Sequence, residues 1–590
     1  MNPASWNQAE VDAYLTHGID TRDTSAVTGT GEHALVVGST GPFAQLAGRK
    51  ALQAGGSATD AVLSTALAQI ALAAGSWVSY AGVFTMVHFH AATGQTESLS
   101  AGFATFAAET EPSTIPTRPQ PSGRTALVPG FMAGVHAAHR RFGVLPWSEL
   151  FAPAVYVAEQ GFPVGSVREH QFTLRADVLA RTPESREIFF SGGQPLLCRG
   201  ATFRQPRLAE TLRHVASQGV EWMYEGPWAR EFVEVVRRDG GRVSLSDLAS
   251  YRPRWAPPLR TDFHGHQVRT VGLPDRGGVA LIYALNLLDE ANLGDPTTDP
   301  EALYWLIQIA RQTARAGAHP EREADRDHAR EVWRRMREAG RFVGPGAIDP
   351  GIHSDFVLAA DAHGNVAAAC HSINTSLWGN TGLFAGGISI PDAACFQQHA
   401  LTQLTPGEHL PFPANPAVVL RAGAPVLASS SIGAGLQVAT LQGLHATLCL
   451  SMSVEQAVNR PLFHGPDYLT GDSVTTIVRE RDTTESIRAR INGPGVGACF
   501  RELATQAHKA GVPDEEILAT VLPAIPQVVE DRFDRALLDA VQTLGQPLSI
   551  RPLDDRTLPR GFWGALSLHV EPPRLRGGRT PYSGGFVESI

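Results

Sequence analysis

SDFVLAADAHGNVAAACHSINTS, residues Ser354 to Ser376, consists of two apolar runs separated by the segment His363-Gly364-Asn365. A Gly-Asn pair beside a polar residue is typical of a tight turn, because both residues tolerate the left-handed backbone region. The flanking runs have the length and composition of strands, so we predict an antiparallel β-hairpin here. Further short apolar segments at Gly387–Ile390 and Ala417–Leu420 extend this sheet-forming part of the chain.

The part of the chain before this hairpin is expected to be mainly helical. Gly41 to Ala74 contains two helical segments interrupted by AGGSATDA, where the paired glycines can end the first helix and Ser57 or Thr59 can cap the second. Val78 to His90 and the following TESLSAGF favour a strand hairpin. The other helices expected are Phe131–Phe142, Trp147–Glu159, Leu208–Ala216, Ala229–Arg238 and Pro300–Ala316, with a charged, exposed helix over Glu321–Arg341.

The composition describes a globular protein, since 43% of the 590 residues are hydrophobic and 18% are charged. The net charge is −9 and Lys occurs only at Lys50 and Lys509, without a dense basic stripe, so no nucleic-acid partner is predicted. The first residues, MNPASWNQAEVDAYLTHG, resemble no secretory signal, which predicts a cytoplasmic protein. The apolar run Ala61–Ala74 contains Ser, Thr and Gln and favours a buried helix, so no membrane partner is expected.

The common cofactor signatures do not occur in a convincing setting. GTGEHA at Gly29–Ala34 resembles a dinucleotide fingerprint, but it precedes an apolar segment when it should follow a strand. His88 and His90 can share one face of a strand, where packing is a simpler role than metal binding. Five widely spaced cysteines favour buried thiols over a disulfide framework or a zinc knuckle. No metal and no cofactor is predicted.

Several segments, taken together, resemble the gamma-glutamyltransferase family of N-terminal-nucleophile hydrolases. AGGSATDAVLSTALA is similar to the early GGNAxDAAVA helix pair of that family, and the 40-residue stretch from Thr125 to Val164, TALVPGF through EQGFPV, is its most specific match. YEGPWAREFVEVVRRDGGRVSLSDLASY resembles the downstream block. The resemblance extends from about Gly41 to His464. It implies an α+β fold, a four-layer αββα sandwich, with residues 1–353 as a large-subunit-like segment and 354–590 as a small-subunit-like segment of one body.

Members of this family cut their own backbone and expose a Thr nucleophile in a pattern like T-T-H-(F/Y)-x-V-V-D-x-D-G-N. Aligning the D-x-x-G-N end of this pattern places Ser354 on the nucleophile and Asp355 and Phe356 on the next two positions. The family's T-x-N then falls without a gap on Ser372 and Asn374. A hydroxyl needs an adjacent base, and a freed α-amine with a pKa of about 7.7 to 8.0 suits that task.

The resemblance also implies roles for other residues. Ser372 is expected to hold the amine or the nucleophile, and Asn374 to line the substrate pocket. In SSIGAGLQ, Gly433 and Ala434 fall where the family's Gly-Gly pair supplies backbone donors to the tetrahedral intermediate; the alternative is an ordinary glycine-rich turn before a helix.

The residues that hold a glutamyl head group in the family are replaced in this chain. Gly102 or a neighbour occupies the place of an Arg, Phe412 and Pro413 replace a Ser pair, and Ala394 and Cys395 replace acids, with only Asp392 nearby. Free γ-glutamyl donors are therefore poor candidate substrates. A more apolar pocket is suggested by the following aromatic residues, any of which can instead belong to the core: Phe103, Phe106, Trp378, Phe384, Phe396 and Phe412.

Three interpretations of function remain open on the sequence alone. The first is cleavage of an amide, γ-glutamyl-like or other acyl, through an acyl-enzyme after self-processing before Ser354. The second is hydrolysis of a C–C bond, as in the alkylproline-pathway homologues of antibiotic producers. The third is an uncleaved, non-catalytic homologue. A small-molecule substrate is expected, and the resemblance allows a homodimer of processed heterodimers.

Overall fold

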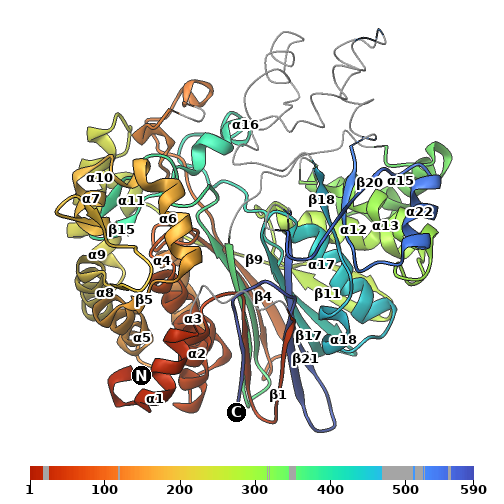
Figure 1. Ribbon diagram of the computed structural model, residues 1–590, viewed down its shortest axis with the longest axis horizontal. Helices are drawn as coiled ribbons and strands as arrows, with labels where there is room; N and C mark the ends of the chain where they lie inside the picture. The colour runs from red at the N-terminus through yellow and green to blue at the C-terminus, as the bar shows by residue number, and fades with distance from the viewer. Residues whose placement is uncertain are drawn as a thin grey trace.

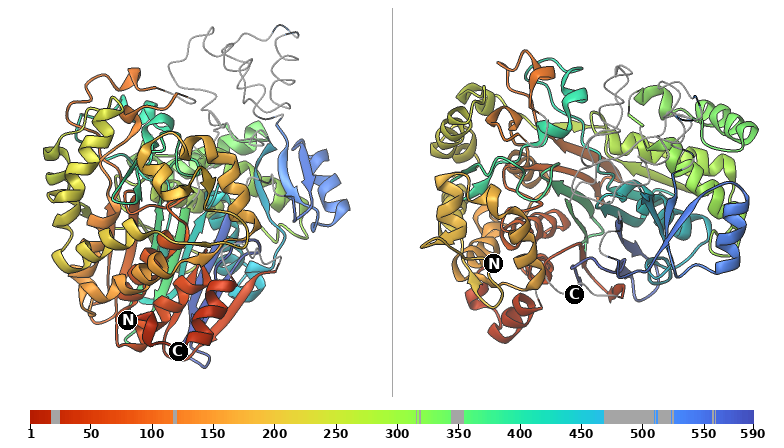
Figure 2. Two further views of the ribbon diagram at one scale, coloured as in Figure 1. Left: turned by 60° about the vertical axis from the view of Figure 1, so that its left-hand side comes forward. Right: turned by 45° about the horizontal axis from the view of Figure 1, so that its top comes forward.

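The computed structural model describes residues 1–17, 25–116, 120–314, 316–317, 319–343, 354–467, 525–555 and 560–590, and the single positions 509, 511, 523 and 558. The side chains at 396, 398 and 399 lie outside this description. Two antiparallel sheets face each other between two layers of helices (Figure 1), and the right-hand view of Figure 2 also shows helices on both sides of the sheets. The predicted αββα fold is confirmed.

Each sheet has seven strands. The first sheet contains, in spatial order, β1 (Val27–Gly31), β22 (Leu575–Arg579), β21 (Phe562–Leu568), β17 (Ala424–Ile432), β16 (Ala417–Arg421), β11 (His266–Thr270) and β10 (Leu259–Phe263). The second contains β23 (Val587–Ser589), β2 (Leu35–Gly38), β12 (Ser354–Ala360), β13 (Val366–Ser372), β3 (Val83–His90), β4 (Gln95–Ala101) and β9 (Arg254–Ala256).

Both sheets combine strands from before residue 354 with strands from after it. In the second sheet, β12 and β13 lie between β2 and β3, which come from the first hundred residues. In the first sheet, β1, β10 and β11 flank four strands from the later part of the chain. Neither segment can therefore form a complete sheet without the other.

Helices cover the outer face of each sheet. The second sheet packs against α2 (Pro42–Gln53), α3 (Ala58–Leu72) and α4 (Phe131–Phe142). Beyond them lie α5 (Trp147–Gln160), α6 (Ser166–Leu179), α7 (Pro183–Phe189), α8 (Pro206–Gln218) and α10 (Pro227–Arg238). The first sheet packs against α12 (Arg276–Ala291), α17 (Leu436–Leu444) and α18 (Val454–Val458), with α13 (Pro300–Thr313), α15 (Arg326–Ala339) and α22 (Arg535–Thr543) outside them.

Smaller elements complete the described part of the chain. They are α1 (Gln8–Thr16), α9 (Glu221–Tyr224), α11 (Leu245–Ala249), α14 (Pro320–Glu323), α16 (Gln398–Leu401), the paired strands β5 (Phe162–Pro163) with β8 (Thr202–Phe203), β6 (Phe190–Ser191) with β7 (Gln194–Pro195), and β14 (Phe384–Ala385) with β15 (Ile388–Ser389). A three-stranded sheet joins β18 (Phe463–Pro466), β19 (Gln527–Glu530) and β20 (Leu548–Arg551).

Local sequence signals account for many of the element boundaries. Ser57 caps α3 in a capping box with Asp60, which satisfies backbone donors at both residues. α4 has the predicted bounds, and the hairpin of β12 and β13 turns at the predicted Gly364. β3 begins later than predicted, at Val83, because residues before it form a turn in which the Ala81 N–H donates to Ser79 Oγ.

The remaining sequence expectations have mixed outcomes. The GTGEHA segment, Gly29–Ala34, contains the end of β1 and the turn that leads into β2. Cys370 and Cys395 are buried as predicted, but Cys198 and Cys449 are half-buried, so that prediction was wrong for these two. Cys499 lies outside the described residues. His88 stacks on Phe142 with ring centroids 3.8 Å apart.

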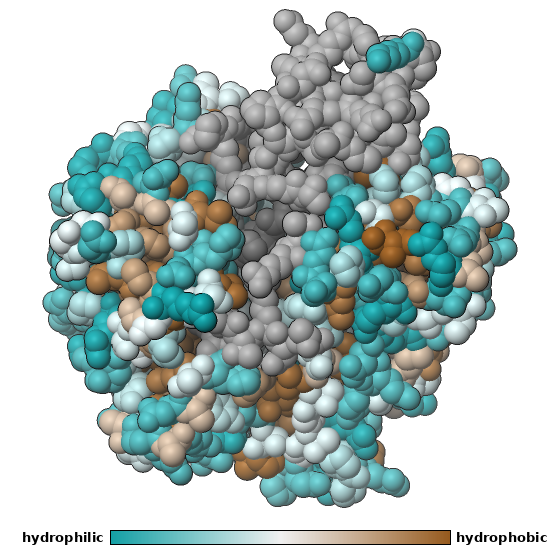
Figure 3. All heavy atoms as spheres, in the orientation of Figure 1, coloured by the Kyte–Doolittle hydropathy of each residue, from teal (hydrophilic) through white to brown (hydrophobic). Residues whose placement is uncertain are grey.

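The visible surface is mostly hydrophilic, with apolar residues distributed among polar ones (Figure 3). The charged helix predicted over Glu321–Arg341 is confirmed in part: it is divided into α14 and α15, with Asp325 capping α15, and the side chains of both are largely exposed. Among the described residues, no helix is long and apolar enough to cross a membrane.

Candidate active site

Ser354 is the first residue of β12, and its side chain faces the space between the two sheets. Alternate residues Phe356 and Leu358 belong to the apolar cluster between the sheets, whereas Val357 packs in the cluster on the helical side. Because side chains alternate along a strand, Ser354 shares the inner face with Phe356. It is 5% exposed. The candidate nucleophile therefore lies at the end of a central strand, in a largely dry environment.

Ser372 lies directly opposite Ser354 on the neighbouring strand. The ladder between β12 and β13 pairs these two residues, which places their side chains on the same face. Directly opposed residues have Cβ atoms about 4.5 to 5.5 Å apart. The backbone N–H of Asn374 donates to Ser372 Oγ at 2.9 Å. The structure thus brings together three of the predicted site residues.

Asn374 has two features that distinguish it from an ordinary loop residue. Its backbone has φ of 51°, in the left-handed region, which Asn tolerates better than most residues that carry a side chain. Its side chain is 3% exposed, and its Oδ1 has no hydrogen-bond partner in the described part of the chain. An unpaired buried acceptor beside Ser372 is suited to receive a hydrogen bond from a substrate.

Cys370 is a further neighbour of Ser354 that the sequence did not suggest as part of the site. It lies two residues deeper along β13 on the same face and is fully buried. Burial raises the pKa of its thiol far above the usual range, while a hydrogen bond with the Ser354 side chain acts in the opposite direction. The thiol is therefore held neutral beside the hydroxyl.

The Gly433-Ala434-Gly435 loop connects β17 to the first turn of α17. Gly433 has φ of 85°, and a Cβ there would meet the Arg560 carbonyl oxygen at 2.5 Å, so glycine is required. Within the described residues, neither the Gly433 nor the Ala434 N–H donates a hydrogen bond to the protein. β17 packs on β12 and β13 across the two sheets. These two N–H groups can therefore serve an oxyanion.

Asp355 points to the opposite face of β12 from Ser354. Its carboxylate accepts hydrogen bonds from Ser39 Oγ at 2.8 Å, Thr40 Oγ1 at 2.6 Å and Trp77 Nε1 at 2.9 Å. It is fully buried. Burial raises its pKa to about 6, although these three donors act to lower it. Sequence reasoning aligned this residue with a family position but gave it no role.

The other three predicted substrate-binding residues have structural partners of their own. Asp392 accepts hydrogen bonds from Thr375 Oγ1 at 2.5 Å and from the Asn380 backbone N–H at 2.9 Å. Trp378 lies in the core on the helical side, where its indole N–H donates to the Ala74 carbonyl at 2.9 Å. Phe103 lies in the apolar cluster between the sheets. Their substrate contacts stay predictions.

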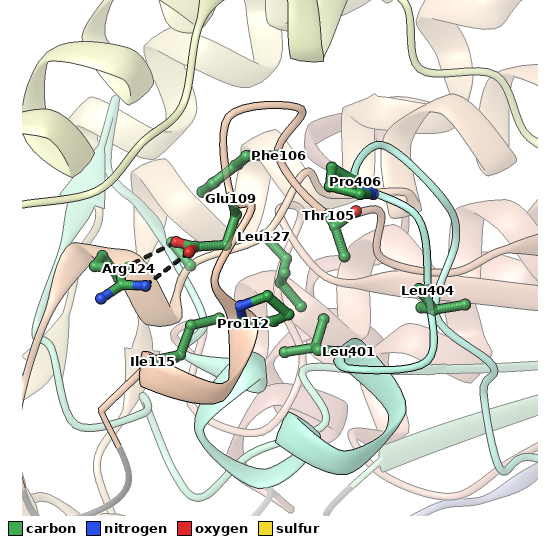
Figure 4. A pocket seen from close by; sticks show the side chains of 11 residues that line it. Thr105, Phe106, Glu109, Pro112, Ile115, Arg124, Leu127, Leu401, Leu404 and Pro406 are labelled. Carbon is green, nitrogen blue, oxygen red and sulfur yellow. Dashed lines mark hydrogen bonds and ion pairs between the residues drawn. The ribbon is translucent and has the colours of Figure 1, made fainter.

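Phe106 belongs to the core on the helical side and also lines a small pocket (Figure 4). None of the predicted catalytic residues lines this pocket, so a substrate contact of Phe106 stays a prediction. Figure 4 also shows Glu109 paired with Arg124 in the wall of this pocket; the shorter of the two bonds is 2.7 Å. Phe412 lies between the sheets and Phe384 on the helical side, while the Phe396 side chain lies outside the described residues. The remaining lining is mainly apolar, from Pro112, Ile115, Leu127, Leu401 and Leu404.

A second buried carboxyl, Asp275, lies on the inner side of the second sheet. It accepts hydrogen bonds from Thr85 Oγ1 and Ser100 Oγ, both at 2.8 Å, and from the Phe412 N–H at 3.3 Å. Burial raises its pKa to about 7. Thr85 is the cross-strand partner of Cys370. The sequence signal was a lone Asp before the paired glycines of LPDRGG, which sequence reasoning did not use.

The model of the family described as gamma-glutamyltranspeptidase matches residues 44–341, about half of the chain. A glutathione hydrolase proenzyme of Pseudomonas aeruginosa is 38% identical over 164 residues, which are 28% of each chain. An acylase ACY 1 proenzyme of a Pseudomonas species is 28% identical over 366 residues, 57% of this chain and 64% of the relative. The matches thus span less than two thirds of these curated relatives.

A solved structure supports the same fold over nearly the whole length. The cephalosporin acylase from Bacillus halodurans superimposes with a TM-score of 0.74 at 18% identity, covering 95% of this chain and 97% of that one. At this identity the likeness concerns the fold alone. The family match, by contrast, rests on sequence and covers α3, which packs on β12 and β13, and β3, which pairs with β13. The chain is therefore a member of the gamma-glutamyltranspeptidase family.

Proposed function

We propose that this chain is an N-terminal-nucleophile hydrolase or acyltransferase that cleaves its own backbone before Ser354 and then uses Ser354 to form an acyl-enzyme. The observation that carries the proposal is the pairing of Ser354 with Ser372 on the inner face of the second sheet, beside the unpaired acceptor of Asn374. The family membership supports the reaction class. The segmentation into residues 1–353 and 354–590 is part of the proposal.

Self-cleavage requires one hydroxyl attack and one water. Ser354 Oγ attacks the carbonyl carbon of the preceding residue, His353, which lies outside the described residues. The C–N bond breaks as the hydroxyl proton passes to the departing nitrogen, which becomes the α-amine of Ser354, and an ester to Oγ forms. Water then hydrolyses this ester, which leaves a new carboxylate at residue 353 and a free Ser354 hydroxyl.

Turnover of a substrate would repeat the same chemistry. The freed α-amine accepts the proton of the Ser354 hydroxyl as this oxygen attacks a substrate carbonyl. The Gly433 and Ala434 N–H groups would stabilise the oxyanion, at roughly 2.7 to 4 kcal/mol for each such donor. The amine returns the proton to the leaving group, and water or another nucleophile takes the acyl group from Ser354.

The surroundings of the site favour an acyl group without a free carboxylate. A side chain at Gly102 would place its Cβ 2.7 Å from the Leu410 carbonyl oxygen, so an Arg does not fit there without a backbone shift. Phe412, which replaces one Ser of the family's pair, donates its N–H to the buried carboxyl of Asp275. A glutamyl carboxylate bound beside this carboxyl would be repelled when both are ionised.

The test of processing is the size and the first residue of the fragments. Purified wild type should migrate as two chains, 1–353 and 354–590, with Ser at the new N-terminus, and Ser354→Ala should stay one chain. A sequenced N-terminus other than Ser354 would contradict the assignment of the nucleophile.

The test of specificity is a glutathione assay with processed protein. The value of kcat/KM should lie below about 10⁴ M⁻¹s⁻¹, the lower end of the ordinary range. A higher value that disappears in Ser354→Ala would show that the protein retains conventional glutamyl recognition.

A further inference from the structure

The nucleophile end of β12 extends beyond the strand that supports it on one side. β2 ends at Gly38 and pairs with β12 only from Val357 to Ala360. On the other side, β13 pairs with the whole of β12, up to Ser354. The first three residues of β12 thus have a regular ladder on one edge alone. Other groups must hold the second edge.

Ser39 and Thr40, which follow β2 directly, provide that support through side chains. Ser39 Oγ donates to the Asp355 carboxylate and also accepts from the Phe356 N–H at 2.9 Å. The Ser39 N–H donates to the Phe356 carbonyl at 3.2 Å. Thr40 Oγ1 donates to the same carboxylate oxygen as Ser39 Oγ. These bonds replace the missing rungs of the ladder.

The third donor to Asp355 comes from a separate part of the chain. Trp77 Nε1 donates to the other carboxylate oxygen. The guanidinium of Arg168 lies 4.8 Å from the centre of the Trp77 ring and donates to the carbonyls of Leu72 and Ala73, at the C-terminal end of α3. The buried carboxylate therefore connects β12 to the end of β2, to the loop before β3 and, through Trp77, to α6.

We propose that Asp355 is a positioning residue that fixes the nucleophile end of β12, and with it the Ser354 hydroxyl, against Ser372. Its relevance to catalysis rests on the proposed role of Ser354, but the clamp itself is a property of the fold. Chain ends are prone to fray unless they are tied down. A cut before Ser354 would make Asp355 the second residue of a new chain, where a clamp on three elements prevents such fraying.

Three variants separate this role from general stabilisation. Asp355→Ala removes all three bonds, and Thr40→Val removes one bond at nearly constant shape. Asp355→Asn is the conservative variant, since its amide can accept from Trp77 and donate to a hydroxyl. The matched control is Asp361→Asn, because Asp361 is a buried carboxyl at the other end of the same strand and accepts from the Ala58, His363 and Asn365 N–H groups.

The first measurement is amide hydrogen exchange resolved along β12. We expect Asp355→Ala and Thr40→Val to lose protection at residues 354–356 by about tenfold or more, while residues 357–360 keep theirs. Asp355→Asn should retain most of the protection, and Asp361→Asn should not affect residues 354–356. On processed protein, where residue 354 carries an amine and no amide, the comparison uses residues 355 and 356. Unchanged protection in both clamp variants, or a loss spread evenly over 354–360, overturns the proposal.

The second measurement is the reactivity of Ser354. The rate of self-cleavage and the rate of labelling by a fluorophosphonate probe should fall about 10- to 100-fold in Asp355→Ala, since misplacement by about 1 Å can cost this much. Asp355→Asn should restore most of both rates. If wild type is neither cut nor labelled, the proposed function fails, and hydrogen exchange still decides whether the clamp exists. If wild type reacts and Asp355→Ala reacts as fast, the positioning role is wrong.

Discussion

The two ends of β12 each carry a buried aspartate, but these aspartates are held in different ways. At the turn end, Asp361 accepts from the backbone N–H groups of His363 and Asn365, within four residues, and from one distant N–H, that of Ala58. At the nucleophile end, Asp355 accepts from Ser39, Thr40 and Trp77, which lie 278 to 316 residues away in sequence. The turn end is thus organised mainly by neighbouring residues, and the nucleophile end entirely by distant ones.

This difference separates stability from activity along a single strand. The turn end fixes the register of the hairpin, whereas the nucleophile end orients one hydroxyl. Changes at the nucleophile end should therefore lower the reaction rate by more than their cost to folding explains, whereas changes at the turn end should lower stability with little effect on the rate. Four predictions test this contrast, beginning with the largest expected effect.

Ser354→Ala should abolish both processing and turnover while leaving the fold intact. Removal of a nucleophile in hydrolases of this kind lowers kcat by about 10³-fold or more. The melting temperature should change by only a few degrees, since the lost atom makes few contacts. Gel mobility, labelling by the fluorophosphonate probe and calorimetry check these expectations; Ser354→Thr, which keeps a hydroxyl, is the control and should retain both activities.

Ala434→Pro should lower the labelling rate or kcat by about 10²- to 10³-fold, because it removes one backbone donor of the proposed oxyanion site. Ala434 precedes the N-cap residue of α17, and its N–H donates no hydrogen bond within the described residues, so Pro removes no internal bond there. Ala434→Gly keeps the N–H group and is the control. Equal rates for the two variants would remove Ala434 from the catalytic site.

The stability of the nucleophile end should depend on pH through Asp355. Its pKa is about 6 in the folded protein against an ordinary value of 3.8, so the folded state binds the proton more tightly than the unfolded state. The contribution of this group to the free energy of unfolding is therefore largest below about pH 4 and is lost as the pH rises through about 6. The total loss is at most about 3 kcal/mol. The other charged or titratable groups facing Asp355 are Arg168 and His371, and burial holds His371 neutral by lowering its pKa to about 3.

Denaturant titrations of wild type and Asp355→Asn at pH 4.5 and pH 7.5 measure this contribution. The wild type should gain stability relative to the variant at the lower pH. A difference that is independent of pH would show that Asp355 titrates normally, and one of opposite sign would show that folding lowers its pKa.

Asp361→Ala should have the smallest effect on the reaction and a clear effect on folding. Loss of the acceptor leaves the buried Ala58 N–H and the turn N–H groups unsatisfied, which costs about 1 to 3 kcal/mol. Denaturant unfolding measures the loss of stability, and the labelling rate of the folded fraction should stay within about twofold of wild type. A selective loss of labelling, without a loss of stability, would contradict the contrast between the two ends.

The same contrast explains how much of the molecule could be predicted from its sequence. The bounds of α4, the capping box at Ser57 and the turn at Gly364 depend on residues within a few positions of one another. The αββα fold and the assignment of Ser354 and Ser372 to the candidate site were implied by resemblance to a family. The clamp on Asp355 and the network around Asp275 could not be predicted, because their donors converge only after the chain has folded.

Some expectations failed for an identifiable physical reason. Apolar residues from Val78 onward suggested a strand, but the hydroxyl of Ser79 bonds to the nearby backbone and favours a turn, so β3 starts at Val83. Aromatic residues such as Trp378 and Phe384 suggested a pocket, yet both pack in the helical-side core. Composition identifies apolar side chains, but not the cavity or core in which they lie.

Both sheets contain strands from before and after residue 354, and this has a consequence for subunit exchange. If the chain is cut before Ser354, β12 and β13 stay hydrogen-bonded between β2 and β3, so the two pieces can separate only by unfolding a whole sheet. Processed molecules carrying different tags on their two pieces should therefore not form hybrids when they are mixed under native conditions. Each molecule would keep for its lifetime the partner it was synthesised with.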